Sequence, residues 1–79
     1  MATFVGFERI TSDLSVMGGQ PCVRGQRITV QRVLEILAQR PSDEDLRADY
    51  PELTEDDLRQ VLAFAAASLG ERVIPLHAA

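Results

Sequence analysis

Residues 17–30 read MGGQPCVRGQRITV, and this stretch joins several backbone-turning residues to the start of an apolar helical pattern. Glycine tolerates the positive φ of tight turns, so Gly18 and Gly19 predict one reversal, and Gly25 predicts a second turn or bulge. Pro21 has no amide hydrogen to donate, which favours the start or edge of a strand. The stretch therefore predicts a short extended segment that folds back directly before a helix.

The first predicted helix begins at the end of this stretch. Its apolar residues recur at intervals of three, four and seven, as on the buried face of an amphipathic helix. These residues are Val30, Val33, Leu34 and Leu37. Thr29 is of a type that caps helix N-termini, and Pro41 predicts that the helix ends near Arg40.

Two more helices are predicted from their acidic first turns, since carboxylates are favoured at a helix N-terminus. The short one follows Ser42 and stops before Pro51, whereas the long one follows the N-cap Thr54 and ends at Gly70. The long helix is expected to bury a single apolar stripe that contains Leu58, Val61, Leu62, Phe64, Ala65 and Leu69.

The two ends of the chain complete the predicted organisation. Residues 3–10, TFVGFERI, predict a short strand, and Ser12 begins a turn. Three short helices, with the tight turn YPELT between the second and third, predict a mainly α helix-turn-helix domain over residues 1–70. Residues 71–79, ERVIPLHAA, are expected to form an extended tail, either docked on the body or offered to a partner.

Size and cysteine content narrow the class of protein. A chain of 79 residues forms one small domain, and such domains commonly need a disulfide, a metal or a partner subunit for stability. Cys22 is the single cysteine, so no disulfide can form within the chain, and with the single histidine, His77, it cannot fill a zinc shell. Self-association is the remaining way to stabilise so small a domain. We therefore expect a homodimer without metal or cofactor.

The expected compartment follows from what the sequence lacks. No apolar run approaches the roughly 20 residues that span a bilayer, and the N-terminus has no basic region followed by an apolar one. Together with the free cysteine, these features predict a cytoplasmic protein with no membrane partner.

Charge is divided unevenly along the chain, whose net charge is −4. Residues 1–40 contain five arginines and three carboxylates, whereas residues 41–79 contain three arginines and nine carboxylates. Such asymmetry can orient a partner. All eight cationic side chains are arginines, which suits bidentate recognition of carboxylate or phosphate groups, and a GC-rich genome is the alternative explanation.

The residues that could perform catalysis do not form a recognisable constellation. His77 lies in the tail without an evident partner, and Cys22 suits packing within a strand. The glycines lack the spacing of a phosphate-binding loop, and the acidic clusters are explained as helix starts. We therefore expect that the protein is not an enzyme.

DNA binding is the second function that the helices suggest. In a helix-turn-helix the third helix would read the DNA, but its first turn, Glu55 to Asp57, would meet the phosphates with like charge. If DNA is bound, the expected contacts are Arg24, Arg27, Arg32 and Arg40. The alternative is that these four are solvated surface arginines.

Nearly the whole chain, from roughly Glu8 to Leu76 and including the tail ERVIPL, resembles a known family. Residues 10–39, ITSDLSVMGGQPCVRGQRITVQRVLEILAQ, and residues 50–66, YPELTEDDLRQVLAFAA, closely resemble the domain-of-unknown-function family 433. The most specific part of the resemblance is a series formed by Gly19, Pro21, Arg24, Gly25, Arg27, Ile28 and Val30. The element from Tyr50 to Thr54 also matches.

The resemblance implies a fold and a function. It implies a small, mainly helical, homeodomain-like helix-turn-helix fold with an N-terminal β-hairpin. Members of this family are commonly regarded as antitoxins of type II toxin–antitoxin pairs, of the VapB kind. The implied partner is a neighbouring PIN-like toxin, a metal-dependent ribonuclease, and repression of the chain's own operon is a further implied role.

The implied partner suggests specific site residues. A PIN-like active site gathers carboxylates around a metal, and an arginine on a rigid hairpin can pair with them bidentately and displace that metal. Arg24 and Arg27 are the expected arginines, with Val73, Ile74 and Leu76 of the tail as a second anchor. Two alternatives stay open. The arginines can instead pair with the chain's own acidic half, and the protein can be a DNA-binding regulator or a homo-oligomeric structural domain.

Overall fold

The stretch at residues 17–30 turns where its glycines predict. The computed structural model describes residues 1–39 and 43–70. Gly18, Gly19 and Gly25 have φ angles of 67°, 85° and 72°, which only glycine adopts without strain. The first reversal is a 3-10 turn, η1 (Met17–Gly19), rather than a hairpin turn. Strand β3 (Cys22–Val23) begins directly after Pro21, as predicted.

The N-terminal residues form two strands rather than one. Strand β1 (Ala2–Phe4) and strand β2 (Phe7–Ser12) are antiparallel, and Gly6, with φ of 84°, forms the turn between them. Strand β3 pairs with β2 on its other edge, where Ile10 lies opposite Val23. The result is a three-stranded antiparallel sheet in the order β1-β2-β3.

The helices follow the predicted boundaries closely. Helix α1 (Val30–Gln39), helix α2 (Asp43–Asp49) and helix α3 (Glu55–Leu69) come after the sheet. The Arg32 N–H donates to Thr29 Oγ1 at 3.0 Å, which confirms Thr29 as a cap of α1. Thr54 and Asp57 form a capping box, in which each side chain accepts from the backbone N–H of the other residue.

The predicted mainly α, homeodomain-like three-helix bundle is wrong, because the sheet supplies much of the core. Ile10 of β2 and Val23 of β3 are completely buried, and the rings of Phe4 and Phe7 meet the ring of Phe64 edge-on, with centroids 4.8 and 5.4 Å away. The core cluster contains Ile10, Val23, Ile28, Val30, Val33, Ile36, Leu46, Leu53, Leu58 and Val61. The protein is a small α+β fold.

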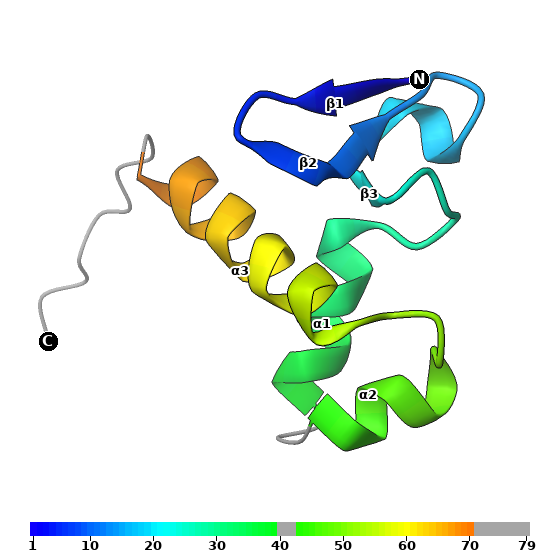
Figure 1. The fold of residues 1–79 in the computed structure, drawn as a ribbon, viewed down its shortest axis with the longest axis vertical. Coiled ribbons are helices and arrows are strands. Elements are labelled where there is room, and N and C mark those ends of the chain that lie inside the picture. The colour runs from blue at the N-terminus through cyan, green and yellow to red at the C-terminus, as the bar shows by residue number, and fades with distance from the viewer. Residues whose placement is uncertain (40–42, 71–79) are drawn as a thin grey trace, which may run out of the picture.

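The arrangement of the layers explains this correction. The sheet lies at one end of the molecule and α2 at the other, with α1 and α3 between them (Figure 1). Helix α3 packs against β2 as well as against α1.

The buried face of α3 also differs from the predicted stripe. Asp57, Leu58 and Val61 are buried on this helix, whereas Leu62 and Leu69 are 51% and 57% exposed. Asp57 turns inward because its carboxylate completes the capping box and two ion pairs, and this rotates Leu62 and Leu69 to the margin of the core face. Within residues 1–39 and 43–70, no helix is long and apolar enough to cross a membrane.

Candidate interaction site

Arg24, one of the two arginines expected to contact a partner, is bound within its own chain. It follows β3 with a φ of 47°, and its Nε–H donates to Asp57 Oδ1 at 3.0 Å and Oδ2 at 3.1 Å. Its Nη2 donates to the Glu52 carbonyl oxygen at 2.6 Å. Arg24 therefore pairs with the acidic half of the chain, which was the alternative to a partner contact.

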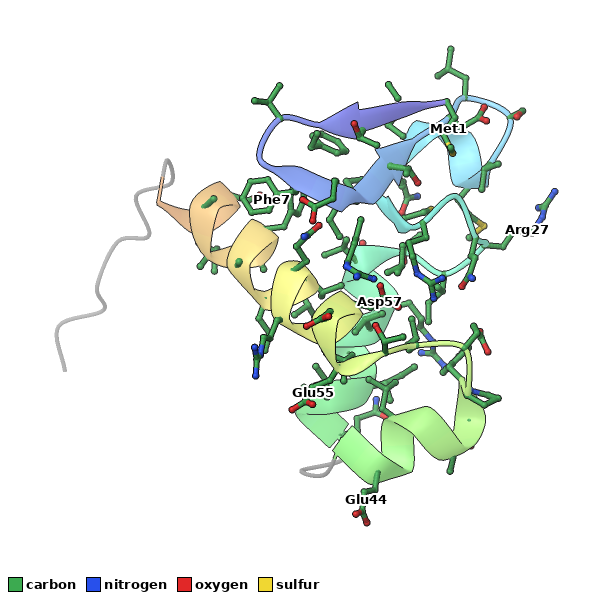
Figure 2. All side chains as sticks on the ribbon, in the orientation of Figure 1. Met1, Phe7, Arg27, Glu44, Glu55 and Asp57 are labelled. Carbon is green, nitrogen blue, oxygen red and sulfur yellow. The ribbon has the colours of Figure 1, made fainter. Side chains whose placement is uncertain are left out.

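Asp57 is the centre of this cluster, and the sequence did not reveal its role. Its side chain has no exposed surface, and it also accepts from Arg9 Nη1 at 2.9 Å and from the Thr54 N–H at 2.9 Å. Figure 2 shows Asp57 in the middle of the molecule, at the start of α3. We call Arg9, Arg24 and Asp57 the ionic clamp, because it joins β2, the turn after β3 and α3.

The charge of the ionic clamp is stabilised despite its burial. Burial of Asp57 by itself raises the pKa of the carboxyl group, because it removes water from the charged form. The hydrogen bonds from the Thr54 N–H, from Arg24 and from Arg9 lower that pKa, and together they outweigh burial. The pKa of Asp57 is thus below its usual range, and the carboxylate is ionised at neutral pH.

The capping-box pattern is the feature of the sequence that could have indicated the position of the Asp57 side chain. Threonine at 54 with an acidic residue three positions later marks a helix start, and that pattern also fixes which way the Asp57 side chain points. Nothing comparable marks Arg9, which lies 48 residues before Asp57 in a strand. A contact between elements so distant in sequence cannot be found from local spacing.

Arg27 differs from Arg24 in its contacts, although both residues are exposed. Arg27 makes no hydrogen bond or ion pair with any residue of the ranges 1–39 and 43–70. Its side chain points away from the body of the molecule (Figure 2). Arg27 is therefore available to a partner, whereas Arg24 is engaged.

The turn that carries Arg27 is held at several points. The Gly25 N–H donates to Thr11 Oγ1 at 2.8 Å, and the Gln26 N–H donates to the Val23 carbonyl at 2.9 Å. The Val23 N–H in turn donates to the Ile28 carbonyl at 3.0 Å, and the Ile28 side chain is buried in the core. With the ionic clamp anchoring Arg24, residues 24–27 present the Arg27 guanidinium from a fixed backbone; we call them the arginine turn.

The other expected contact residues are not gathered at this turn. Arg32 is exposed on α1, so it projects from a different element. Arg40 and the tail residues Val73, Ile74 and Leu76 lie outside the described residues. Within the described residues, the Arg24 side chain is thus engaged by Asp57 and Glu52, whereas the side chains of Arg27 and Arg32 make no ion pair.

Negative charge covers a different part of the surface. Exposed carboxylates on α2, on the turn before α3 and on its first helical turn include those of Glu44, Asp49, Glu52, Glu55 and Asp56. Figure 2 shows Glu44 and Glu55 near the α2 end of the molecule, away from Arg27. A DNA phosphate approaching the start of α3 would meet this acidic surface, which opposes binding there.

A second surface feature is an apolar groove between α1 and α3, with a volume of about 490 Å³. No residue that lines it is charged. Its lining consists of Gln20, Pro21, Thr29, Val30, Gln31, Leu34, Ala65, Ser68 and Leu69. An uncharged, open groove of this size suits an apolar side chain or helix of another molecule.

Cys22 has the packing role that its position in a strand favours. It is buried, and burial raises the pKa of its thiol, so the thiol remains protonated at neutral pH. His77, the other residue considered for chemistry, lies outside the described residues. Cys22 is therefore a small apolar core residue.

Comparison with known proteins gives one match. The model of the family described as "Protein of unknown function (DUF433)" matches residues 10–65. The matched region runs from β2 into α3 and includes the arginine turn and Asp57. No curated protein and no solved structure matches the chain.

Proposed function

This chain belongs to the DUF433 family, and we propose that it is a toxin-neutralising interaction module. Its partner is a PIN-like ribonuclease encoded by a neighbouring gene, and both proteins act in the cytoplasm. The single observation that carries the proposal is the exposed Arg27 on the hydrogen-bonded arginine turn, which has no ion-pair partner within residues 1–39 and 43–70.

The chemistry of Arg27 suits the active site of such a nuclease. A metal-dependent nuclease holds its metal with clustered carboxylates, which carry excess negative charge once the metal is absent. A guanidinium is planar, always charged and able to donate two parallel hydrogen bonds to a carboxylate. Arg27 can therefore replace part of the metal's charge and block the site without any reaction.

The turn makes that contact more favourable than a flexible arginine would. Ordering a mobile segment on binding opposes association, so a backbone that is already fixed loses less entropy. The Gly25–Thr11 and Gln26–Val23 hydrogen bonds fix the turn from inside, and the ionic clamp fixes its first residue. Arg24 thus supports the Arg27 contact by holding the turn rather than by entering the partner.

The charge distribution orients the complex. Glu44 and Glu55 lie near the α2 end of the molecule, so an acidic active site would be repelled from that end and attracted to the arginine turn. Val73, Ile74 and Leu76 are the expected second anchor, because an apolar peptide can add contact area beyond the charged site. Operator binding through α3 is not part of the proposal, since Glu55 and Asp56 are exposed at its first turn.

The proposal is tested by RNA cleavage with the purified neighbouring nuclease and Mn²⁺. The wild-type chain should inhibit cleavage, and Arg27→Ala should need at least about tenfold more protein for the same inhibition, because a charge-assisted pair is lost. Arg27→Lys should recover only part of the effect, since lysine cannot bind bidentately.

Arg32→Ala is the matched control, because Arg32 is also an exposed arginine but lies on α1. It should inhibit like the wild type. Equal inhibition by Arg27→Ala and the wild type would contradict the proposal. Absence of inhibition, combined with salt-dependent retention of the chain's own promoter DNA, would instead support a DNA-binding regulator.

A further inference from the structure

Helix α3 carries a second apolar stripe that the core does not use. Leu62, Ala65 and Leu69 are spaced three and four residues apart, so they lie on one side of the helix. Leu62 and Leu69 are more than half exposed, and Ala65 is half-buried. The buried face of the same helix is formed by Asp57, Leu58 and Val61. We call Leu62, Ala65 and Leu69 the outer stripe.

The outer stripe continues into the groove between α3 and α1. Ala65 and Leu69 belong to both, and the opposite wall is formed by Val30 and Leu34 of α1. No charged side chain lines the groove, in a chain with a net charge of −4. This face is therefore one that a second acidic molecule can approach without meeting like charge.

We infer that the outer stripe and the groove form a two-fold symmetric interface between two copies of this chain. Residues 62–69 read LAFAAASL, in which Leu62 and Leu69, and likewise Ala65 and Ala66, are placed symmetrically about the midpoint. In an antiparallel pair of α3 helices that cross at this midpoint, Leu62 of one copy lies against Leu69 of the other. Ala65 and Ala66 meet at the crossing, where their small side chains let the helices approach. A two-fold interface requires this kind of self-complementarity.

The charges of α3 favour the antiparallel arrangement. Glu55 and Asp56 are at the N-terminal end of the helix, ten and nine residues before Ala65. In the antiparallel pair, the two Glu55 residues are about 30 Å apart along the helix axis, at 1.5 Å per residue. That is nearly four times the screening length of about 8 Å at physiological ionic strength, so the acidic turns repel each other little.

The interface leaves the arginine turn free. Figure 2 shows Arg27 on the opposite side of the molecule from the C-terminal end of α3. A dimer formed through α3 therefore presents two arginine turns facing outward. The inference itself does not depend on the proposed function, because it rests on the outer stripe and the groove.

Sedimentation equilibrium of the full chain tests the inference. The wild type should dimerise with a Kd of about 1–100 µM, as expected for a small interface. Leu69→Glu and Leu62→Arg should each raise the Kd at least about tenfold, because each places a charge in an apolar contact. Leu14→Glu is the control, since Leu14 is 89% exposed on a loop far from α3 along the chain, and it should leave the Kd unchanged.

The double variant, L62R with L69E, tests whether the two α3 helices pair antiparallel. In the antiparallel pair residue 62 faces residue 69 of the partner, so L62R and L69E together should form an intermolecular ion pair and recover most of the wild-type affinity. Far-UV circular dichroism should show the same fold for all variants, because the changed residues are exposed. A chain that stays monomeric at about 500 µM, or a dimer whose Kd the single changes do not alter, would overturn the inference. A failure of the combined variant to recover would overturn the antiparallel pairing.

Discussion

Arg24 donates a bifurcated hydrogen bond to the carboxylate of Asp57. Arg24 Nε lies 3.0 Å from Asp57 Oδ1 and 3.1 Å from Asp57 Oδ2. The two residues are 33 positions apart, so their contact fixes the turn after β3 against the start of α3. It also holds Arg24 at a φ of 47°, a conformation that disfavours a non-glycine residue by about 1–2 kcal/mol. Together with the hydrogen bonds of Gly25 and Gln26, this contact fixes the turn that carries the exposed Arg27.

Removal of the buried carboxylate should strongly destabilise the protein. Asp57→Ala leaves Arg9 and Arg24 without their common partner and removes the capping box of α3. Breaking a buried pair costs about 3–5 kcal/mol, and the partial exposure of both arginines reduces this to about 2–3 kcal/mol. Urea denaturation followed by circular dichroism measures the change in the free energy of unfolding.

The neighbouring Asp56 provides the matched control for this measurement. Its side chain is 67% exposed, and its Oδ2 lies 3.8 Å from Arg9 Nη2. Such a surface pair contributes little, so Asp56→Ala should change the free energy of unfolding by less than about 0.5 kcal/mol. Equal effects of the two alanine variants would show that the ionic clamp does not stabilise the fold.

The ionic clamp should also make stability depend on acid. The folded-state pKa of Asp57 is lower than the unfolded value because the Thr54, Arg24 and Arg9 hydrogen bonds outweigh the opposing effect of burial. A group of this kind stabilises the fold fully above its unfolded pKa of about 3.9, and the effect is lost as pH falls through the folded pKa. The free energy of unfolding should therefore be flat from about pH 7 to pH 5 and fall below about pH 4.

Asp57→Asn separates this contribution from those of other carboxyls. The variant should be less stable at pH 7 and should lose less stability on acidification than the wild type. Some acid dependence should remain, because the pKa of half-buried Asp13 is also lowered, by the hydroxyl and the N–H of Ser15. Parallel pH profiles for Asp57→Asn and the wild type would contradict the assignment.

The glycine of the arginine turn should matter for both stability and binding. Gly25→Ala forces an L side chain to a φ of 72°, which costs about 1–2 kcal/mol. A Cβ there would also lie 2.7 Å from Met1 Sδ, the flexible end of a side chain that can move. The variant should unfold at lower urea concentration and inhibit the nuclease less, because the turn that carries Arg27 is shifted.

Gly6→Ala is the control for the backbone effect alone. Gly6 has a φ of 84°, and no atom lies within 4 Å of the position that a Cβ would take. Gly6→Ala should lose about as much stability as Gly25→Ala. At a temperature where both variants are folded, however, Gly6→Ala should inhibit the nuclease as well as the wild type does. If both variants lost inhibition equally, the geometry of the arginine turn would not determine binding.

Local patterns in the sequence predicted the helices well. The spacing from Val30 to Leu37 gave α1, and Thr54 with its acidic neighbours gave the start of α3, because caps and periodicity act within a few residues. Pro21 and Gly25 likewise predicted the strand start and the turn. These features depend on steric and hydrogen-bonding properties that each residue carries by itself.

Long-range packing explains what the sequence did not predict. The second N-terminal strand depends on Gly6 and on the contact of Phe4 and Phe7 with Phe64, about 60 residues away. The exposure of Leu62 follows from the inward turn of Asp57, which needs Arg9 from β2 as well as Arg24. At the site, the sequence identified the arginine turn, but only the structure distinguished Arg24, which Asp57 engages, from Arg27, which has no partner among the residues that the structure describes.

The most direct test is the affinity of this chain for the PIN-like nuclease, measured by calorimetry over a range of Mn²⁺ concentrations. If the Arg27 guanidinium takes the place of the metal, the two compete, and the Kd of the wild-type chain should rise with Mn²⁺. Arg27→Ala should bind at least about tenfold more weakly, with a Kd that does not respond to Mn²⁺. A wild-type Kd that is the same with and without Mn²⁺, or an Arg27→Ala variant that binds like the wild type, would contradict the account.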